Sequence, residues 1–115
     1  MLVGEVLNQV AHEKKEKVVA SFKDKEITYL DLEAKSNQVA KGLIDLNIDV
    51  EDMVSILLPN NLEFLITYFG VMKSGATMVP INIMYEAPAI EYILNNSEAK
   101  VLITSQDFLP RIEKC

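Results

Sequence analysis

The chain has 115 residues, half of them apolar and 24% charged, with 17 acidic residues against 11 basic ones. This length suits one domain with a real hydrophobic core and is too short for two. The net charge of −6 argues against the basic face that a nucleic-acid-binding protein needs, so no nucleic-acid partner is expected.

Cysteine usage and hydropathy predict a cytoplasmic protein. The one cysteine, Cys115, is the last residue, so no intramolecular disulfide can form. Glu5 interrupts the first apolar run well short of a signal-peptide core, and no stretch approaches the roughly 18 apolar residues of a transmembrane helix. Without a secretion signal, the sequon at residues 95–97 is not expected to carry a glycan.

The first 47 residues predict a helix, a β-hairpin and a second helix. Apolar residues at helical spacing from Val3 to Val10 indicate an amphipathic helix. Two β-rich runs, 18–22 and 27–29, flank the polar turn 23–25. Thr28 is placed to cap the second helix, and Asn47 can adopt the left-handed conformation that ends it. Its expected buried face consists of Leu32, Val39, Ala40, Leu43, Ile44 and Leu46.

The next segment predicts a buried strand and a helix. The apolar run 53–58, stopped by Pro59, is typical of a strand buried on both faces. Asn60 and Glu63 have capping-box spacing for the helix, whose last turn carries Lys73 and which Gly75 ends. The residues expected to share one face of this helix are Leu62, Leu65, Ile66, Phe69 and Met72.

The remaining elements complete a β-α alternation. Residues 77–81 predict a strand that ends or becomes irregular at Pro80, Pro88 starts a short helix, and residues 100–104 predict another strand. Asp107 is the expected cap of the last helix, which places Pro110 in its first turn. Short connections predict an α/β fold: a mostly parallel sheet with helices on both faces, preceded by an N-terminal helix and β-hairpin.

Most catalytic chemistries lack the residues they need, and we assign no catalytic, cofactor-binding or metal-binding residue. His12, the one histidine, lies in a mixed-charge stretch and is expected to be an exposed helix-end residue. One histidine and one cysteine at opposite ends do not make a zinc site. The Lys-Ser pair in residues 70–75 sits where a helix ends, so a helix C-cap explains Gly75 better than a phosphate cradle.

The carboxylates and methionines have ordinary interpretations. Glu51, Asp52 and Glu113 have no evident partner for acid–base chemistry and are expected to serve solubility. The methionines around one strand and the loop after it are expected to fill gaps in the core: Met72, Met78 and Met84.

Four ordered segments are more informative than composition. Residues 27–32 read Ile-Thr-Tyr-Leu-Asp-Leu, and residues 72–82 read Met-Lys-Ser-Gly-Ala-Thr-Met-Val-Pro-Ile-Asn. Residues 57–64 place Pro-Asn between strand and helix, and residues 91–103 continue in register. Together these segments resemble the first two core motifs, and their surroundings, in the adenylate-forming superfamily. Residues 80–85 resemble long-chain fatty-acid–CoA ligases more than peptide-synthetase modules. Ser74 replaces the usual Ala, and Asp24-Lys25 replaces an Asp-Gly turn.

The resemblance implies a parent enzyme that activates a fatty acid with ATP and Mg²⁺ to an acyl-adenylate and transfers the acyl group to coenzyme A. It implies that the phosphate loop, the magnesium ligand, the ribose-binding Asp and the catalytic Lys lie beyond the matched region. We therefore interpret residues 1–115 as the N-terminal subdomain of an AMP-binding domain, with the remainder of the enzyme absent. The two motifs are scaffold, and the piece is expected to bind none of these cofactors and to be inactive alone.

An isolated subdomain is expected to expose apolar surface and to self-associate through it.

The alternative to the ligase fragment is a complete small flavodoxin-like binding or interaction module without catalysis. A reading frame that continues past Cys115 into a Ser/Thr/Gly-Lys loop would exclude that alternative.

Overall fold

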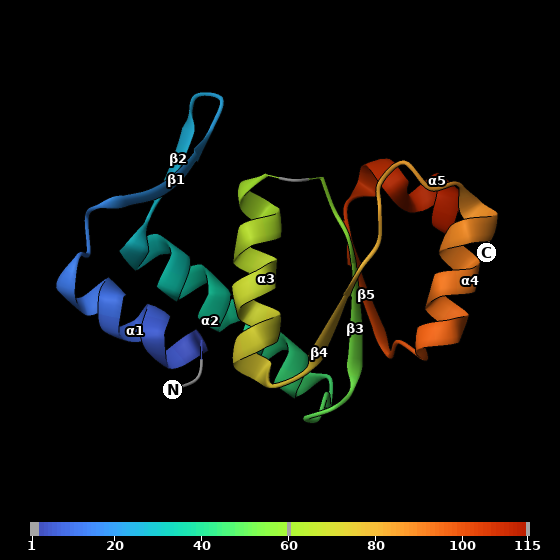
Figure 1. The fold of residues 1–115 in the computed structure, drawn as a ribbon, viewed down its shortest axis with the longest axis horizontal. Helices are drawn as coiled ribbons and strands as arrows, with labels where there is room; N and C mark the ends of the chain where they lie inside the picture. The colour runs from blue at the N-terminus through green and yellow to red at the C-terminus, as the bar shows by residue number, and fades with distance from the viewer. Residues whose placement is uncertain (1–2, 60, 115) are drawn as a thin grey trace.

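A three-stranded parallel sheet lies at the centre of the computed structural model, which describes residues 3–59 and 61–114 (Figure 1). Its strands are β3 (Met53–Leu57), β4 (Thr77–Pro80) and β5 (Val101–Thr104), in the order β4-β3-β5. Both outer strands run parallel to β3. The predicted parallel sheet is confirmed, and β4 ends at Pro80 as expected, because proline cannot donate to a ladder.

Helices cover both faces of this sheet, as predicted (Figure 1). On one side lie α2 (Tyr29–Asp45) and α3 (Leu62–Ser74). On the other side lie α4 (Ala87–Ser97), the 3₁₀ turn η1 (Gln106–Phe108) and α5 (Leu109–Ile112). Among the described residues, no helix combines the length and hydrophobicity needed to cross a bilayer.

The N-terminal residues form the predicted helix and hairpin beside this sheet unit. Helix α1 (Val3–Glu13) is followed by the antiparallel strands β1 (Val18–Phe22) and β2 (Lys25–Thr28), which project from the body of the fold (Figure 1). Phe22 pairs with Lys25, so the turn is the two residues Lys23 and Asp24, one fewer than predicted. Lys23 adopts a φ of 56°. In a two-residue hairpin turn, glycine adopts such a positive φ more readily than lysine does.

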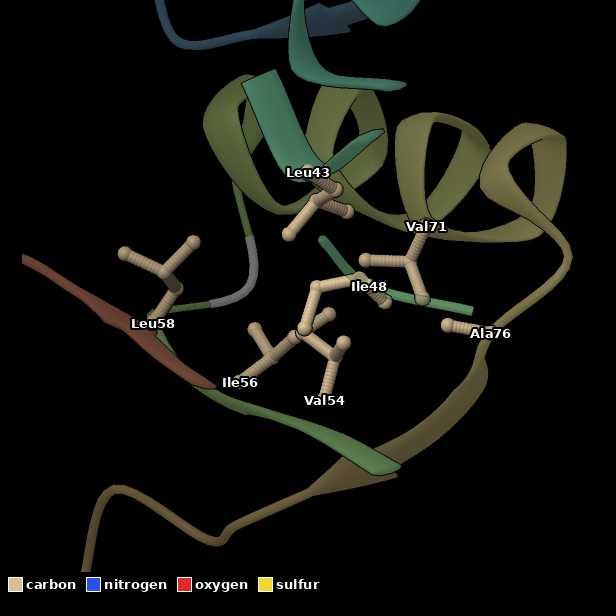
Figure 2. Close-up of a cluster of buried hydrophobic side chains, with 7 residues drawn as sticks. All are labelled: Leu43, Ile48, Val54, Ile56, Leu58, Val71 and Ala76. Atoms are coloured by element: carbon tan, nitrogen blue, oxygen red, sulfur yellow. The ribbon is translucent and has the colours of Figure 1, made fainter. Parts of the chain in front are cut away.

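Strand β3 is buried on both faces, as the continuous apolar run predicted. Val54, Ile56 and Leu58 alternate toward α2 and α3, while Leu57 points toward α4. Figure 2 shows the first cluster, in which they meet helix, loop and strand residues: Leu43, Ile48, Val54, Ile56, Leu58, Val71 and Ala76. Full burial of each large side chain is worth about 1.5–3 kcal/mol relative to exposure, so this cluster contributes substantially to the stability of the fold.

A second apolar cluster joins α3 to the hairpin around Ile27 and Leu32. The predicted face of α3 supplies four of its partly buried members: Leu62, Leu65, Ile66 and Phe69. Met72 was wrongly placed on this face, because its side chain is 36% exposed. Met84, predicted to fill a core gap, lies in the exposed loop after β4 and is 79% exposed, whereas Met78 does pack against the core.

The buried face of α2 differs from the prediction at its end. Leu32, Ala40 and Leu43 are buried and Val39 packs against the core, as expected. Ile44 and Leu46, near the point where the helix ends at Asp45, are 57% and 62% exposed, and Ile48 after the turn is the residue that packs into the core. Asn47 adopts the predicted left-handed conformation, with φ 64°. Fully buried Ser36 takes the remaining place on this face.

The capping residues of α2 and α3 were predicted correctly except at the start of α3, where the cap lies one residue later than predicted. The Asp31 amide donates to Thr28 Oγ1 at 3.1 Å, which confirms the cap of α2. The cap of α3 is Asn61, whose Oδ1 accepts from the Phe64 amide at 3.2 Å, so the prediction of Asn60 was wrong. Asn60 itself lies outside the described residues. Gly75 ends α3 in the left-handed region, as predicted.

The last helix begins differently from the prediction. Asp107 lies inside η1, where Ser105 holds the cap position, and α5 starts only at Leu109. The 3₁₀ turn takes up the residues that were expected to form the first α-helical turn. Pro110 nevertheless lies in the first turn of α5, where its missing N–H costs little.

Candidate functional site

The strand connections create one crevice at the carboxyl edge of the sheet. After β3 the chain passes to α3 on one face, and after the adjacent strand β5 it passes to η1 and α5 on the other (Figure 1). In open α/β sheets, ligands bind where neighbouring strands diverge in this way. The order β4-β3-β5 is also the start of the flavodoxin-like order, in which the same rule holds.

A cavity of about 410 Å³ occupies this position. Its walls come from the hairpin tip 22–25, residues 58–59 after β3, residues 61–63 at the start of α3, and Ser105 and Asp107 after β5. Phe22, Leu58 and Leu62 supply apolar lining, and Asn61 and Ser105 supply polar groups. The volume lies within the range of small-molecule sites, so this crevice is the candidate functional site of the described residues.

Charges of both signs surround the crevice. Lys23 and Lys25 flank Asp24 at the hairpin tip, while Glu63 and Asp107 lie on the side of the sheet. The N-terminus of α3 also points its partial positive charge toward this edge, where Glu63 in the first turn complements it. The mixed signs do not make the crevice an anion site, in contrast to a phosphate loop.

The crevice holds a hydroxyl but no paired base. Ser105 Oγ is buried and has no hydrogen-bond partner among the described residues. A serine nucleophile needs an adjacent base, usually a histidine oriented by a third group. His12 is exposed in the last turn of α1, as predicted, and lines no wall of the crevice. Ser105 is therefore a buried polar group of the crevice lining, with no base beside it among the described residues.

The residues present do not fit a magnesium–nucleotide site. Within residues 3–59 and 61–114, no group of three or more His, Cys, Asp or Glu residues could hold a metal ion. Gly75 is a helix C-cap with φ 85°, and a Cβ there would lie 3.0 Å from Val50 Cγ2. This glycine serves backbone conformation at the end of α3, whereas a phosphate loop requires glycines where a helix begins. No step involving ATP or Mg²⁺ can be assigned to these residues.

A second polar cluster joins α2 to α3 through Glu33, which directly follows the motif segment 27–32, and Lys73, which lies in the motif segment 72–82. Lys73 Nζ of α3 lies 3.0 Å from Glu33 Oε2 of α2, and the two side chains are 9% and 12% exposed. Lys73 also donates to Ser36 Oγ at 2.7 Å and to Asn37 Oδ1 at 2.8 Å. Glu33 Oε1 accepts from Asn8 of α1 and from Asn37, each at 3.1 Å. One ion pair thus ties together three helices.

The electrostatics of this junction favour the charged carboxylate. Burial raises the pKa of the Glu33 carboxyl, but hydrogen bonds from Asn8, Lys73 and Asn37, with the positive charge of Lys73, lower it by more. The net pKa therefore lies below its ordinary value. The stability of a hydrogen-bonded ion pair of this kind depends strongly on how the helices that carry it pack together.

Sequence reasoning missed this junction and assigned Lys73 only to the helix dipole. Glu33 and Lys73 are 40 residues apart, so no local pattern pairs them. A signal was nevertheless present on α2, because Glu33, Ser36 and Asn37 follow the i, i+3, i+4 spacing of one helix face. That polar stripe borders the buried stripe of the same helix and indicates a buried polar contact.

A third contact braces the loop after β4. The Arg111 guanidinium of α5 donates to the carbonyls of Ile83 and Tyr85 and lies 5.4 Å from the centre of the Phe108 ring. These carbonyls belong to the segment 80–85, whose sequence resembles the CoA ligases.

Asp52, which was predicted to serve only solubility, also has partners in the structure. Its carboxylate accepts a hydrogen bond from the Asp49 amide at 2.7 Å and forms an ion pair with Lys100.

Known proteins resemble this chain over nearly its whole length. The model of the family described as AMP-binding enzymes matches residues 7–115. The chain belongs to this family. The resemblance of the two motifs to the adenylate-forming superfamily is thereby confirmed.

The relatives of this chain include a CoA ligase and a peptide antibiotic synthase. The chain is 38% identical over 90 residues to the long-chain-fatty-acid–CoA ligase FadD13 of Mycobacterium tuberculosis. The aligned region covers 78% of this chain and 18% of that protein. The chain is 29% identical over 107 residues to tyrocidine synthase 1 of Brevibacillus parabrevis, covering 90% of this chain and 10% of that protein. The chain therefore spans less than a fifth of either relative.

Solved structures of the same family superpose closely. The anthranilate CoA ligase AuaEII, in complex with anthranoyl-AMP, matches with a TM-score of 0.93 and 32% identity over 99% of this chain and 22% of that one. A fatty acyl CoA synthetase of Mycobacterium tuberculosis matches with a TM-score of 0.89 and 34% identity over 98% of this chain and 23% of that one. The α/β fold with its N-terminal helix and hairpin is thus a fold of this family.

Proposed function

We propose that residues 1–115 are the N-terminal subdomain of a longer AMP-forming ligase, which activates a carboxylic acid with ATP and Mg²⁺ and passes the acyl group from the adenylate to coenzyme A. The observation that carries this proposal is the superposition of 99% of the chain on about a fifth of an acid–CoA ligase. In this proposal the subdomain is scaffold: it contributes the sheet, its helices and the Glu33–Lys73 junction, and the chemistry belongs to other parts of the enzyme.

The proposed acid is a fatty acid. Support comes from 38% identity over 90 residues to a long-chain-fatty-acid–CoA ligase, against 29% over 107 residues to tyrocidine synthase 1 and 35% over 104 residues to surfactin synthase subunit 1. The segment Pro-Ile-Asn-Ile-Met-Tyr at residues 80–85, which Arg111 braces, also resembles the fatty-acid enzymes. Such an enzyme would act in the cytoplasm on fatty acid, ATP and coenzyme A.

Amino-acid adenylation is the second candidate. It is favoured by the extent of the peptide-synthetase matches, since a linear gramicidin synthase of Brevibacillus parabrevis is 32% identical over 99% of this chain and 2% of that protein. Anthranilate, the substrate named for AuaEII, makes an aryl acid the third acid to test. The flavodoxin-like module is the non-catalytic alternative, and it shares the strand order but not the family match.

Acid-dependent exchange of pyrophosphate into ATP by the enzyme that contains these residues tests the proposal. The panel is palmitate, anthranilate and phenylalanine, each with and without Mg²⁺. Exchange with palmitate, followed by formation of a thioester with coenzyme A, is the expected result. Exchange with phenylalanine alone would transfer the proposal to peptide synthetases, and no exchange with any acid would favour the non-catalytic module.

A further inference from the structure

We draw no further inference here: the strongest candidate beyond the crevice, the apolar groove between the β-hairpin and α3 lined by Ala20, Phe22, Leu62 and Leu65, is an unpartnered face, and nothing in the structure shows what covers it.

Discussion

Lys73 of α3 and Glu33 of α2, which lie 40 residues apart in the sequence, form an ion pair of 3.0 Å that connects the two helices. Around this pair, Asn8, Ser36 and Asn37 satisfy the remaining donors and acceptors. Because taking two charges out of water is costly, such a pair stabilises the fold only while both partners are present. The ion pair and its hydrogen bonds therefore join α1, α2 and α3 at one place.

Removing both partners of this pair should destabilise the fold by less than the sum of the two single removals. Lys73→Met leaves the Glu33 carboxylate without its cation, and we expect it to lower the free energy of unfolding by about 3 kcal/mol. Glu33→Gln should have a cost of similar order. In the double variant the costs should not add, with a coupling of about 1 kcal/mol or more, measured by urea denaturation.

The matched control is the pair of Lys100 and Asp52, which has nearly the same length of 3.2 Å but leaves the lysine side chain 57% exposed. The same cycle with Lys100→Met and Asp52→Asn should give a much smaller coupling, because solvent screens an exposed pair. Equal coupling energies for the two pairs would contradict the structural role assigned to the Glu33–Lys73 junction.

Acidification should weaken the fold partly through Glu33. The pKa of this carboxyl is lower in the folded chain than its ordinary value, so its contribution is fully present above the unfolded pKa of about 4.3. That contribution is lost as the pH falls through the folded pKa. We expect the free energy of unfolding, followed by urea denaturation at successive pH values, to decrease below about pH 5.

Substitution separates Glu33 from the other carboxyls in this pH dependence. Asp52 also has a lowered pKa, chiefly because the Asp49 amide donates to it, so it supplies a second contribution with the same sign. Glu33→Gln should therefore flatten part of the acid limb and Asp52→Asn another part. An acid limb that is unchanged in Glu33→Gln would show that the junction does not hold this carboxylate ionised.

Two glycines in helices should respond in opposite ways to alanine. At Gly70 an added Cβ would clash with Val39 Cβ, because α2 and α3 approach closely there. Gly70→Ala should lower the free energy of unfolding by about 1–3 kcal/mol. At Gly42 nothing lies within 4 Å of the added atom, so Gly42→Ala should raise stability by about 0.5–1 kcal/mol. Thermal unfolding of both variants checks this, and a stabilising Gly70→Ala would contradict the close contact.

The 115-residue chain is expected to self-associate. Large apolar side chains are exposed at the end of α2, on the following loop and on α4, including Leu46, Val50 and Tyr92, which are 62%, 71% and 68% exposed. Exposed apolar surface of this kind favours association in water. Sedimentation velocity over a range of concentrations should show an increasing average mass, whereas a monomer at all concentrations would count against the expectation.

Much of the fold could be predicted because its signals are local. The 3.6-residue period indicated α2 and α3, the apolar run indicated β3, and Thr28 and Gly75 indicated helix ends where the structure has them. Errors arose where the outcome depended on tertiary position. Ile44 has the right periodicity, but its exposure depends on where α2 ends relative to the sheet.

Local sequence patterns could not predict the candidate site. The crevice is built from the hairpin tip, the start of α3 and the residues after β5, which only the strand order brings together. The same is true of Glu33 and Lys73, whose contact requires two helices to pack at one depth and register. The motif resemblance reached the family correctly because it compared segments in order and did not depend on their contacts.

We propose that these residues are scaffold and that the chemistry of the ligase lies elsewhere in the enzyme. The most direct test is fatty-acid-dependent exchange of pyrophosphate into ATP, measured on the 115-residue chain beside the longer enzyme. We expect exchange by the longer enzyme and none above background by the 115 residues. Clear exchange by the 115 residues alone would contradict the claim.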